Sequence, residues 1–463
     1  MKLIKKIAAI MFAFMMVVSM STNVSAEGTN NGTITINNAV DGQTYTIYKL
    51  LDLESYTPDP GTDDGIYSYK PNKLWKNFIE TAVDSASTNY FKINENGYAT
   101  WNGDTTDSRK AEFAQKALAY AKDEAHPIAG DPRKKEEGKT LTFTNLSLGY
   151  YLVDSSVGTL CSLDTTKPAA TIQEKNGVPS VDKIITSGGV VSADGKSNSA
   201  SIGDTVNFKT TITAQPGAQN YVLHDKMTEG LTFDKNSINV SLHKKATNAD
   251  ETLVTNTDYN VETINLKDTD LKCTFHINFT QTLCNRLAAD DTITVTYSAT
   301  LNDKAVIGST GNVNETKLNY GDSKETTESK THTFTYDIPV FKYTMKDNVK
   351  TGLEHAKFTL SLNEDGANPI KFKESNENNK YIKDETGAIT EVESPQDGKL
   401  TFEGLGAGTY YLTETKQPDG YNKLAKSVKI EMDANGTIKV DGKSTLESEE
   451  SKRLVEVENK TGT

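Results

Sequence analysis

Three side chains toward the C-terminal end of the chain have the types needed to form an amide bond inside the protein. Glu414 alternates with Tyr410 and Leu412 along a predicted strand, so period two places its carboxylate on the apolar face. A lone buried carboxylate is costly unless it gains a proton or finds a partner. Lys342 on an earlier strand and Asn459 on a later one fall on apolar faces in the same way, so all three can meet in one core.

Together these residue types can make an isopeptide bond. A lysine amine that burial keeps neutral is a nucleophile, an asparagine carboxamide is an electrophile, and a protonated glutamate can polarise the carbonyl while ammonia leaves. In the competing interpretation, Lys342 extends to solvent and Glu414 only accepts hydrogen bonds at a strand end. Three suitable residues in a consistent order favour the reaction.

The segments around these residues carry a family resemblance. They are Phe341-Lys342, Lys350–Leu360 and Tyr411–Tyr421. In this order they resemble a Cna-B domain of Gram-positive surface proteins, and the strand with Glu414 resembles the E-box of sortase-assembled pilins. The resemblance implies that Lys342 and Asn459 form the bond, that Glu414 catalyses it, and that residues 335–463 are a C-terminal Cna-B domain.

A second set of the same residue types lies in the middle of the chain. The segments that carry it are Pro179–Ile185, Leu223–Phe233 and Gly311–Tyr320. Their order resembles the fimbrial isopeptide-formation domain, which implies that Lys183 bonds to Asn314 and that Asp225 is the acid, within residues 177–334. Two alternatives stay open, because Asn312 shares a strand face with Asn314 and because Asp225 is also suited to capping a turn.

The N-terminal region, residues 27–176, is predicted to be a related domain with helices inserted. Thr33–Ile36 and Tyr45–Tyr48 alternate like two strands of a hairpin around a turn at Asp41-Gly42. Two later stretches, Leu74–Ala82 and Ala111–Ala121, have apolar residues at helical spacing. We therefore expect two helices packed on a sheet.

An internal repeat links the first and last domains. Leu141–Asp154 aligns with Leu400–Glu414, and Asp154 stands where Glu414 stands. The first strand of the N-terminal domain has no lysine to act as the nucleophile. We therefore predict no isopeptide bond there.

Both ends of residues 1–176 carry export or assembly signals. Residues 1–26 have lysines, then a short apolar run, then Val24-Ser25-Ala26, as in a cleaved secretory signal peptide. Lys175, before an interdomain turn, resembles the pilin lysine that a sortase joins to the next subunit; Lys167 is the alternative. After Asn459 the family would continue into a sorting signal, and we expect the given sequence to stop before it.

Composition excludes several function classes. The 463 residues carry a net charge of −13, which disfavours nucleic acid and anionic membrane as partners. The three cysteines are too few for a disulfide framework, and we expect buried free thiols rather than a Cys273–Cys284 pair. The six histidines show no ligand spacing, so we predict no metal site and no cofactor. Motifs of catalytic turnover are missing, so the chain is not expected to be an enzyme beyond its own crosslinking.

The fold class expected is mainly β, with three tandem immunoglobulin-like or Cna-type β-sandwich domains, the first with a helical insert. The resemblance implies a secreted major pilin of a cell-wall fimbrium. Its partners would be other copies of itself joined head to tail, a pilin-specific sortase and accessory pilins. The alternative function is a cell-surface adhesin that binds a host matrix protein. An enzyme carried on Cna-B stalk domains is a further alternative.

Overall fold

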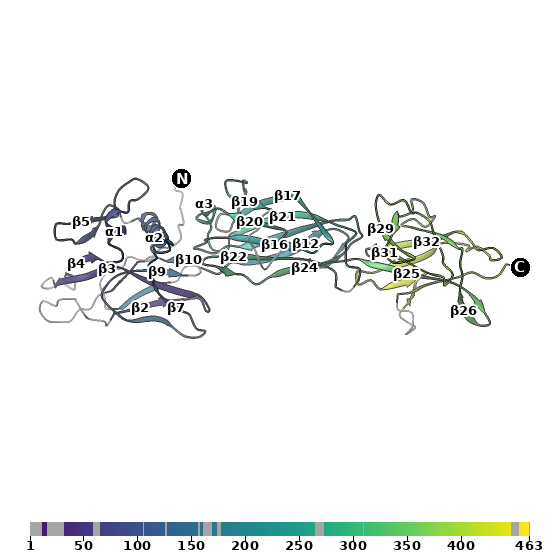
Figure 1. The fold of residues 1–463 in the computed structure, drawn as a ribbon, viewed down its shortest axis with the longest axis horizontal. Helices are drawn as coiled ribbons and strands as arrows, with labels where there is room; N and C mark the ends of the chain where they lie inside the picture. Colours follow the sequence, from purple (N-terminus) through teal and green to yellow (C-terminus); the bar gives the residue numbers. More distant parts are fainter. Residues whose placement is uncertain are drawn as a thin grey trace.

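The computed structural model is an elongated molecule in which three β-rich parts follow one another (Figure 1). The structure describes residues 12–15, 32–58, 65–104, 106–125, 127–155, 158–160, 169–173, 177–263, 273–308, 310–445 and 453–462. Strands dominate the described residues, which confirms the mainly β prediction. Buried hydrophobic side chains of the described residues form a separate cluster in each part.

The first part has a two-stranded sheet of β5 and β6 and two larger sheets, with helices beside them (Figure 1). One larger sheet has the strand order β1-β9-β3-β4, with β7 on β3 and β10 on β9, and the other has the order β11-β2-β8. The two predicted helices are confirmed as α1 and α2. The bounds are β1 Phe12–Met15, β2 Gly32–Asn37, β3 Thr44–Pro58, β4 Gly65–Pro71, α1 Lys76–Thr81, β5 Phe91–Ile93, β6 Ala99–Trp101, α2 Asp107–Ala121, β7 Asp131–Lys134, β8 Leu141–Leu146, β9 Gly149–Ser155, β10 Gly158–Leu160 and β11 Ala169–Gln173.

The predicted hairpin between the first two strands of this part is wrong. β2 pairs with β8 and β11, whereas β3 pairs with β4, β7 and β9. Ile34 and Ile36 of β2 and Tyr45 and Ile47 of β3 are all buried in one core. The alternation in each strand correctly indicates a buried face. It does not show which strands pair, and here the two strands belong to different sheets that pack on the same core.

Part of the predicted signal peptide is described. β1 lies within residues 1–26 and pairs antiparallel with β9, from Phe12 opposite Leu152 to Met15 opposite Gly149. The rest of that segment lies outside the described residues. Among the residues that the structure does describe, no helix is long and apolar enough to cross a membrane.

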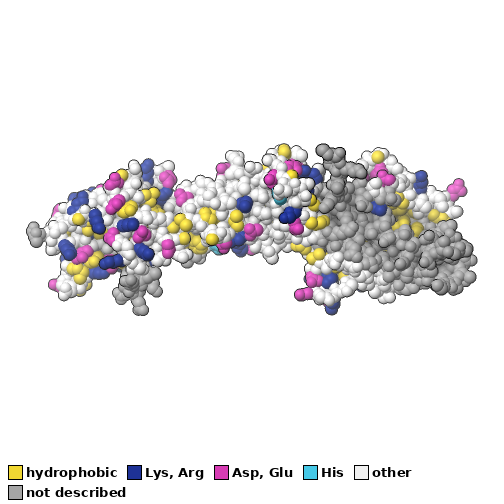
Figure 2. Space-filling view, turned by 180° about the vertical axis from the view of Figure 1, so that it is seen from behind, with side chains coloured by type: hydrophobic (Ala, Val, Ile, Leu, Met, Phe, Trp, Pro, Cys, Tyr) yellow, Lys and Arg dark blue, Asp and Glu magenta, His cyan; other side chains and the backbone are white. Residues whose placement is uncertain are grey.

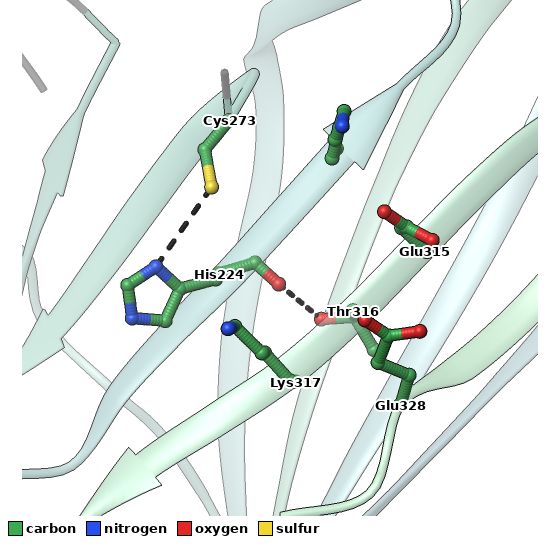
Figure 3. Close-up of a pocket in the computed structure, with 7 residues that line it drawn as sticks. His224, Cys273, Glu315, Thr316, Lys317 and Glu328 are labelled. Atoms are coloured by element: carbon green, nitrogen blue, oxygen red, sulfur yellow. Dashed lines mark hydrogen bonds between the residues drawn. The ribbon is translucent and has the colours of Figure 1, made fainter. Parts of the chain in front are cut away.

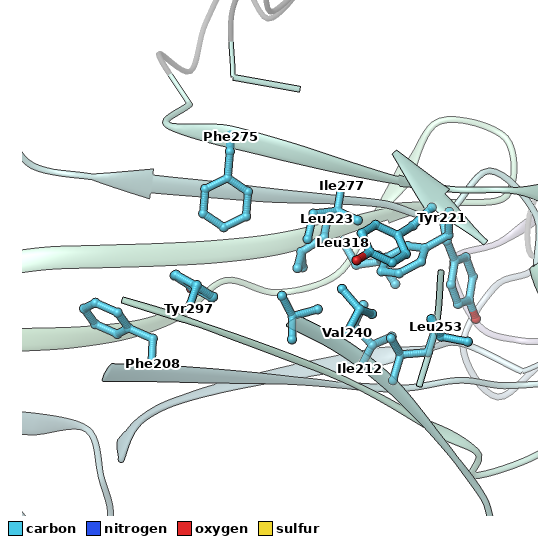
Figure 4. Close-up of a cluster of buried hydrophobic side chains, with 14 of the residues drawn as sticks. Phe208, Ile212, Tyr221, Leu223, Val240, Leu253, Phe275, Ile277, Tyr297 and Leu318 are labelled. Carbon is cyan, nitrogen blue, oxygen red and sulfur yellow. The ribbon is translucent and has the colours of Figure 1, made fainter. Parts of the chain in front are cut away.

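The middle part is a sandwich of two sheets. Their orders are β12-β15-β21-β17-β18 and β13-β14-β24-β22-β16-β20-β19, with β23 on β22. Alternate residues of β15, β21 and β22 are buried, and aliphatic and aromatic side chains fill the space between the sheets (Figure 4). The bounds are β12 Ser180–Ser187, β13 Val190–Val191, β14 Ser197–Ser199, β15 Thr205–Thr213, β16 Val222–Met227, β17 Leu231–Lys244, β18 Ala249–Thr252, β19 Tyr259–Glu262, β20 Phe275–Phe279, α3 Gln281–Cys284, β21 Thr292–Leu301, β22 Asn312–Tyr320, β23 Lys324–Glu325 and β24 Ser329–Phe334.

The last part is a second sandwich. One sheet has the order β26-β25-β31-β29-β28, with β36 parallel to β25, and the other has the order β30-β27-β32-β33-β34-β35. The bounds are β25 Tyr336–Lys346, β26 Val349–Gly352, β27 Lys357–Ser361, β28 Phe372–Glu374, β29 Lys380–Lys383, β30 Val392–Glu393, β31 Lys399–Leu405, β32 Gly408–Lys416, β33 Val428–Met432, β34 Ile438–Val440, β35 Lys443–Ser444 and β36 Val455–Glu458. The first and last strands of this sandwich are therefore neighbours.

Hydrogen bonds join the middle and last parts. The backbone N–H of Ile202 donates to the carbonyl of Gly404 at 2.9 Å, and Lys383 Nζ donates to the carbonyl of Ile202 at 2.8 Å. The chain also runs from β24 into β25 with a single residue, Thr335, between them. At the other junction, Gln43 Nε2 donates to Tyr320 Oη at 3.4 Å. On the surface, acidic and basic side chains are interspersed, as Figure 2 shows for one face.

Candidate functional site

The last sandwich brings together the three side chains that the sequence analysis singled out there. Lys342 lies on β25, Glu414 on β32 of the facing sheet, and Asn459 directly after β36. Alternate residues of each strand point into the core, so these polar side chains take positions that apolar ones hold elsewhere on the same strands. All three are buried, with Lys342 fully excluded from solvent.

Glu414 contacts both other members of this cluster. Its Oε1 lies 3.8 Å from Lys342 Nζ, and its Oε2 accepts a hydrogen bond from Asn459 Nδ2 at 3.2 Å. Oε2 also accepts from the backbone N–H of Leu424 at 2.8 Å, which fixes the carboxylate. The acid therefore bridges the amine and the carboxamide.

Burial sets the protonation of the amine. It lowers the pKa of Lys342 to about 8, and the nearby carboxylates of Glu414 and Glu458 offset only part of that effect. Lys342 Nζ otherwise donates to the carbonyl of Val457 at 3.3 Å. Glu414 Oε1 and Asn459 Oδ1 are buried without a hydrogen-bond partner among the described residues. Two buried oxygens without hydrogen-bond partners, beside an amine of lowered pKa, raise the free energy of the folded core. Their presence is easier to explain in a reactive site than in a core that only packs.

The middle sandwich holds a second cluster of the same kind. Lys183 on β12 makes a short ion pair with Asp225 Oδ2 on β16 of the facing sheet. Tyr297 on β21 hydrogen-bonds through its hydroxyl to that same carboxylate oxygen and to Lys183 Nζ. The rings of Tyr297 and Phe208, both labelled in Figure 4, stack with their centroids 5.5 Å apart. Lys183 Nζ lies over both rings, and the lysine is completely buried.

The asparagine of this cluster is Asn314 rather than Asn312. Both side chains are completely buried. The side-chain amide of Asn312 already forms hydrogen bonds with the backbone: its Oδ1 accepts from the N–H of Val306 at 2.9 Å, and its Nδ2 donates to the carbonyls of Val306 and Thr333 at 3.2 and 3.1 Å. The amide of Asn314 instead donates to Tyr297 Oη at 3.4 Å, and its Oδ1 has no partner among the described residues.

Burial again governs the charges. It lowers the pKa of Lys183 and raises the pKa of Asp225, while the attraction between the two opposes both shifts. It also raises the pKa of Tyr297 well above the ordinary value, so this hydroxyl keeps its proton. A proton passed from Lys183 to Asp225 leaves a neutral amine and a neutral acid, which is the pair of species that amide formation requires.

Sequence reasoning missed Tyr297. It lies on a strand that the family motifs do not include, and its neighbours in sequence give it the pattern of an ordinary core aromatic. Only the folded arrangement shows that its hydroxyl meets the lysine, the acid and the asparagine.

In the first part the structure gives Asp154 a lysine partner that the sequence did not suggest. Lys122, which caps the C-terminal end of α2, lies 3.0 Å from Asp154 Oδ2. Burial lowers the pKa of Lys122, but Asp154 and Asp322 outweigh this and raise it. The amine is therefore charged and half exposed, which does not suit a nucleophile. The two predicted sortase acceptors, Lys175 and Lys167, lie outside the described residues.

Two histidines that show no ligand spacing in the sequence lie together in the fold. His224, His276 and Cys273 have ligand atoms within 4.8 Å of one another, although they come from separate segments. Sequence spacing missed them because sheet pairing, rather than a local motif, brings them together. Neither Cys273 nor Cys284 is in a disulfide, and Cys273 is half-buried rather than part of the core.

Two family models match the regions of the chain that contain these clusters. Residues 193–324, which include Asp225 and Asn314, match the model of the Gram-positive pilin backbone subunit 2, Cna-B-like domain. Residues 340–445, which include Lys342 and Glu414, match the SpaA prealbumin-like fold domain. The chain is a relative of the Gram-positive backbone pilins.

Three individual proteins are similar to this chain. The trypsin-resistant surface T6 protein of Streptococcus pyogenes serotype M6 is 23% identical over 273 residues, which are 55% of this chain and 46% of that protein. The chain thus spans less than half the length of this relative. The structure of the T6 backbone pilin of S. pyogenes is 18% identical, covers 89% of this chain and 81% of that one, and has a TM-score of 0.53, which shows a shared fold. The group B streptococcus pilus 2b backbone protein is 25% identical, covers 61% of this chain and 98% of that one, and has a TM-score of 0.45.

Proposed function

We propose that this protein is the major shaft subunit of a cell-surface fimbrium and that two internal isopeptide bonds stabilise it. The observation that carries this proposal is the pair of buried lysine, acid and asparagine clusters in regions related to pilin backbone domains. The role is structural, and the only chemistry is the crosslinking of the protein by itself. The proposed units are residues 27–176, 177–334 and 335–463.

Each crosslink joins a lysine to an asparagine. The Nζ of Lys342 attacks the Cγ of Asn459; the new N–C bond forms, the old C–N bond to the carboxamide nitrogen breaks, and ammonia leaves. Glu414, carrying the proton that the lysine gave up, polarises the carboxamide and passes that proton to the departing nitrogen, which leaves as ammonia. The attacking nitrogen gives its second proton to the Glu414 carboxylate as it becomes the amide N–H, so the acid ends protonated. Lys183, Asn314 and Asp225 take the same roles in the middle sandwich.

Tyr297 is proposed to position the middle cluster. Its hydroxyl contacts Lys183, Asp225 and Asn314 at once and keeps its proton. It can therefore hold the carboxylate oxygen and the carboxamide in place while the proton moves between the lysine and the acid.

Subunits are proposed to join head to tail. A pilin-specific sortase would link the threonine of a C-terminal sorting signal on one copy to Lys175 of the next, with Lys167 as the alternative acceptor. The same contact repeated from copy to copy is heterologous and does not close, so it produces an open filament. Other copies of the chain, the sortase and accessory pilins are the partners of this assembly.

The test is the intact mass of the purified, folded chain, followed by peptide mapping. Two bonds predict a deficit of two ammonia molecules, with Lys183 linked to Asn314 and Lys342 linked to Asn459. Lys183→Ala and Lys342→Ala should each restore one ammonia. Lys235→Ala and Lys350→Ala, at exposed lysines of the same two sandwiches, should leave the deficit unchanged. A wild-type chain with its full mass would contradict the proposal and favour the adhesin alternative.

A further inference from the structure

Two histidines meet on the outer face of the middle sandwich. His224 on β16 and His276 on β20 are direct register partners in an antiparallel pair. Their rings stand edge to face with centroids 4.2 Å apart, and His224 Nδ1 lies 2.9 Å from His276 Nε2. The inward neighbour, Asp225, points to the opposite side of β16, so the histidine pair lies apart from the lysine cluster.

A thiol joins this pair. Cys273 precedes β20 and is half-buried, with its Sγ 3.8 Å from His224 Nδ1 (Figure 3). The three ligand atoms lie within 4.8 Å of one another, and both imidazoles are nearly completely buried. Two nitrogens and one sulfur that converge from a pair of strands form a compact, partly enclosed donor set.

We propose that His224, His276 and Cys273 form a binding site for a Zn²⁺-like transition metal ion. Zinc binds imidazole nitrogen at about 2.0 Å and thiolate sulfur at about 2.3 Å, so one ion can span nitrogens 2.9 Å apart and a sulfur 3.8 Å from one of them after a small rotation of Cys273. An imidazole and thiolate set without a carboxylate selects zinc-like ions over Ca²⁺ and Mg²⁺. The proposal is independent of the crosslinking reaction.

Metal binding would move one proton within the histidine pair and release another from the thiol. A neutral histidine pair at this distance shares one N–H···N hydrogen bond. Metal binding breaks that bond, and the proton between the rings moves to an outer ring nitrogen by a change of tautomer. The thiol releases its proton to solvent as it becomes the thiolate ligand, so one proton is released for each ion bound.

The surroundings leave room for a fourth ligand and balance the charge. A surface pocket opens beside the donor atoms, so a water molecule can complete a tetrahedral set (Figure 3). Its lining has two lysines and two glutamates, and consists of His224, Lys226, Cys273, Glu315, Thr316, Lys317 and Glu328. Lys317 is the nearest strand partner of His224 on β22, but its amine pairs with Glu325 at 2.9 Å. That pairing reduces the repulsion between the ammonium and a bound cation.

Zinc retention by the full chain tests the site. The chain is freed of metal with a chelator, mixed with Zn²⁺ alone and dialysed, and bound zinc is measured. We expect one zinc per wild-type chain and at least a tenfold loss of affinity in Cys273→Ser and in His276→Ala. His243→Ala, at a partly exposed histidine of the same sandwich, should bind like wild type. Failure of the wild-type chain to retain zinc, or equal retention by Cys273→Ser, would overturn the proposal.

Two further readouts identify the ligands. Co²⁺ in place of zinc should give a thiolate-to-cobalt charge-transfer band that disappears in Cys273→Ser. Zn²⁺ should also protect Cys273 from alkylation, as located by peptide mapping. Cys273→Ser alters a half-exposed side chain, and its unchanged melting temperature without metal would show that it folds. A cobalt spectrum without the thiolate band would exclude Cys273 as a ligand and overturn the site as proposed.

Discussion

Lys183 and Asn314 lie on opposite sheets of the middle sandwich, on β12 and β22. In the last sandwich, by contrast, Lys342 and Asn459 belong to neighbouring parallel strands of one sheet, and only the acid comes from the facing sheet. The middle crosslink would therefore tie two sheets together, whereas the last one would tie the first strand of a sandwich to its final strand. Both enclose most of a sandwich within a covalent loop.

This placement predicts how the chain responds to pulling. Tension applied between residues 178 and 462 would pass through the two crosslinks, so the loops between each lysine and its asparagine would stay folded. In Lys183→Ala the middle loop of roughly 130 residues should be released and should add about 40 nm of extension. Single-molecule force spectroscopy measures this length directly.

The comparison for the pulling experiment is Lys235→Ala, which removes an exposed lysine from the same sandwich. It should extend no further than the wild-type chain. A wild-type chain that extends as far as Lys183→Ala would show that the middle loop is not closed.

The acids can be tested without touching the residues that are joined. In Glu414→Gln the carboxamide can neither take a proton from Lys342 nor return one to the leaving nitrogen, so the last bond should fail while the middle one forms. The mass should then be one ammonia below the mass calculated from the variant's sequence, against two for wild type. Glu456→Gln, which alters a partly exposed acid on β36, is the matched control and should keep the full deficit of two ammonia molecules. Loss of both ammonia molecules from Glu414→Gln would contradict a catalytic role for this acid.

Tyr297 gives a sharper prediction, because its hydroxyl is not one of the reacting groups. Tyr297→Phe keeps the buried ring against Phe208 but removes the contacts to Lys183 and Asp225. We expect a tenfold or greater fall in the fraction of chains that carry the middle crosslink. Intact mass measures this fraction, which a purely structural role would leave unchanged. Tyr221→Phe, at a buried tyrosine of the same core, is the control and should crosslink fully.

The strands and their buried faces were accessible from sequence because period two is a local signal. It placed Lys342, Glu414 and Asn459 on inward faces, and all three are buried. The same signal failed for pairing, since alternation in β2 and β3 reports a buried face on each strand but not the sheet to which it belongs. Pairing is decided by the whole core, so the hairpin was predicted where two sheets exist.

The side-chain clusters also differ in whether the sequence reveals them. In the last sandwich the lysine, acid and asparagine can be predicted because each is a polar residue on an apolar strand face. In the middle sandwich the family resemblance is needed as well, since Asn312 and Asn314 share one strand face. Tyr297 was missed because a tyrosine in a strand is unremarkable until its hydroxyl has a partner. His224, His276 and Cys273 were missed because cross-strand register brings them together, and register is set by tertiary pairing.

The last prediction concerns the cost of burying Lys342 when no bond forms. Asn459→Ala leaves the amine uncrosslinked, with a folded-state pKa of about 8 against an ordinary value of 10.5. Between these pH values the unfolded chain binds more protons than the folded one, so the free energy of unfolding should rise with pH. The rise due to this lysine should be about 3 kcal/mol. Chemical denaturation of Asn459→Ala at pH 7 to 10.5, compared with Asn459→Ala combined with Lys342→Met, isolates this contribution. The double variant should lack this rise, and equal pH dependence in both chains would show that Lys342 is not buried as an amine.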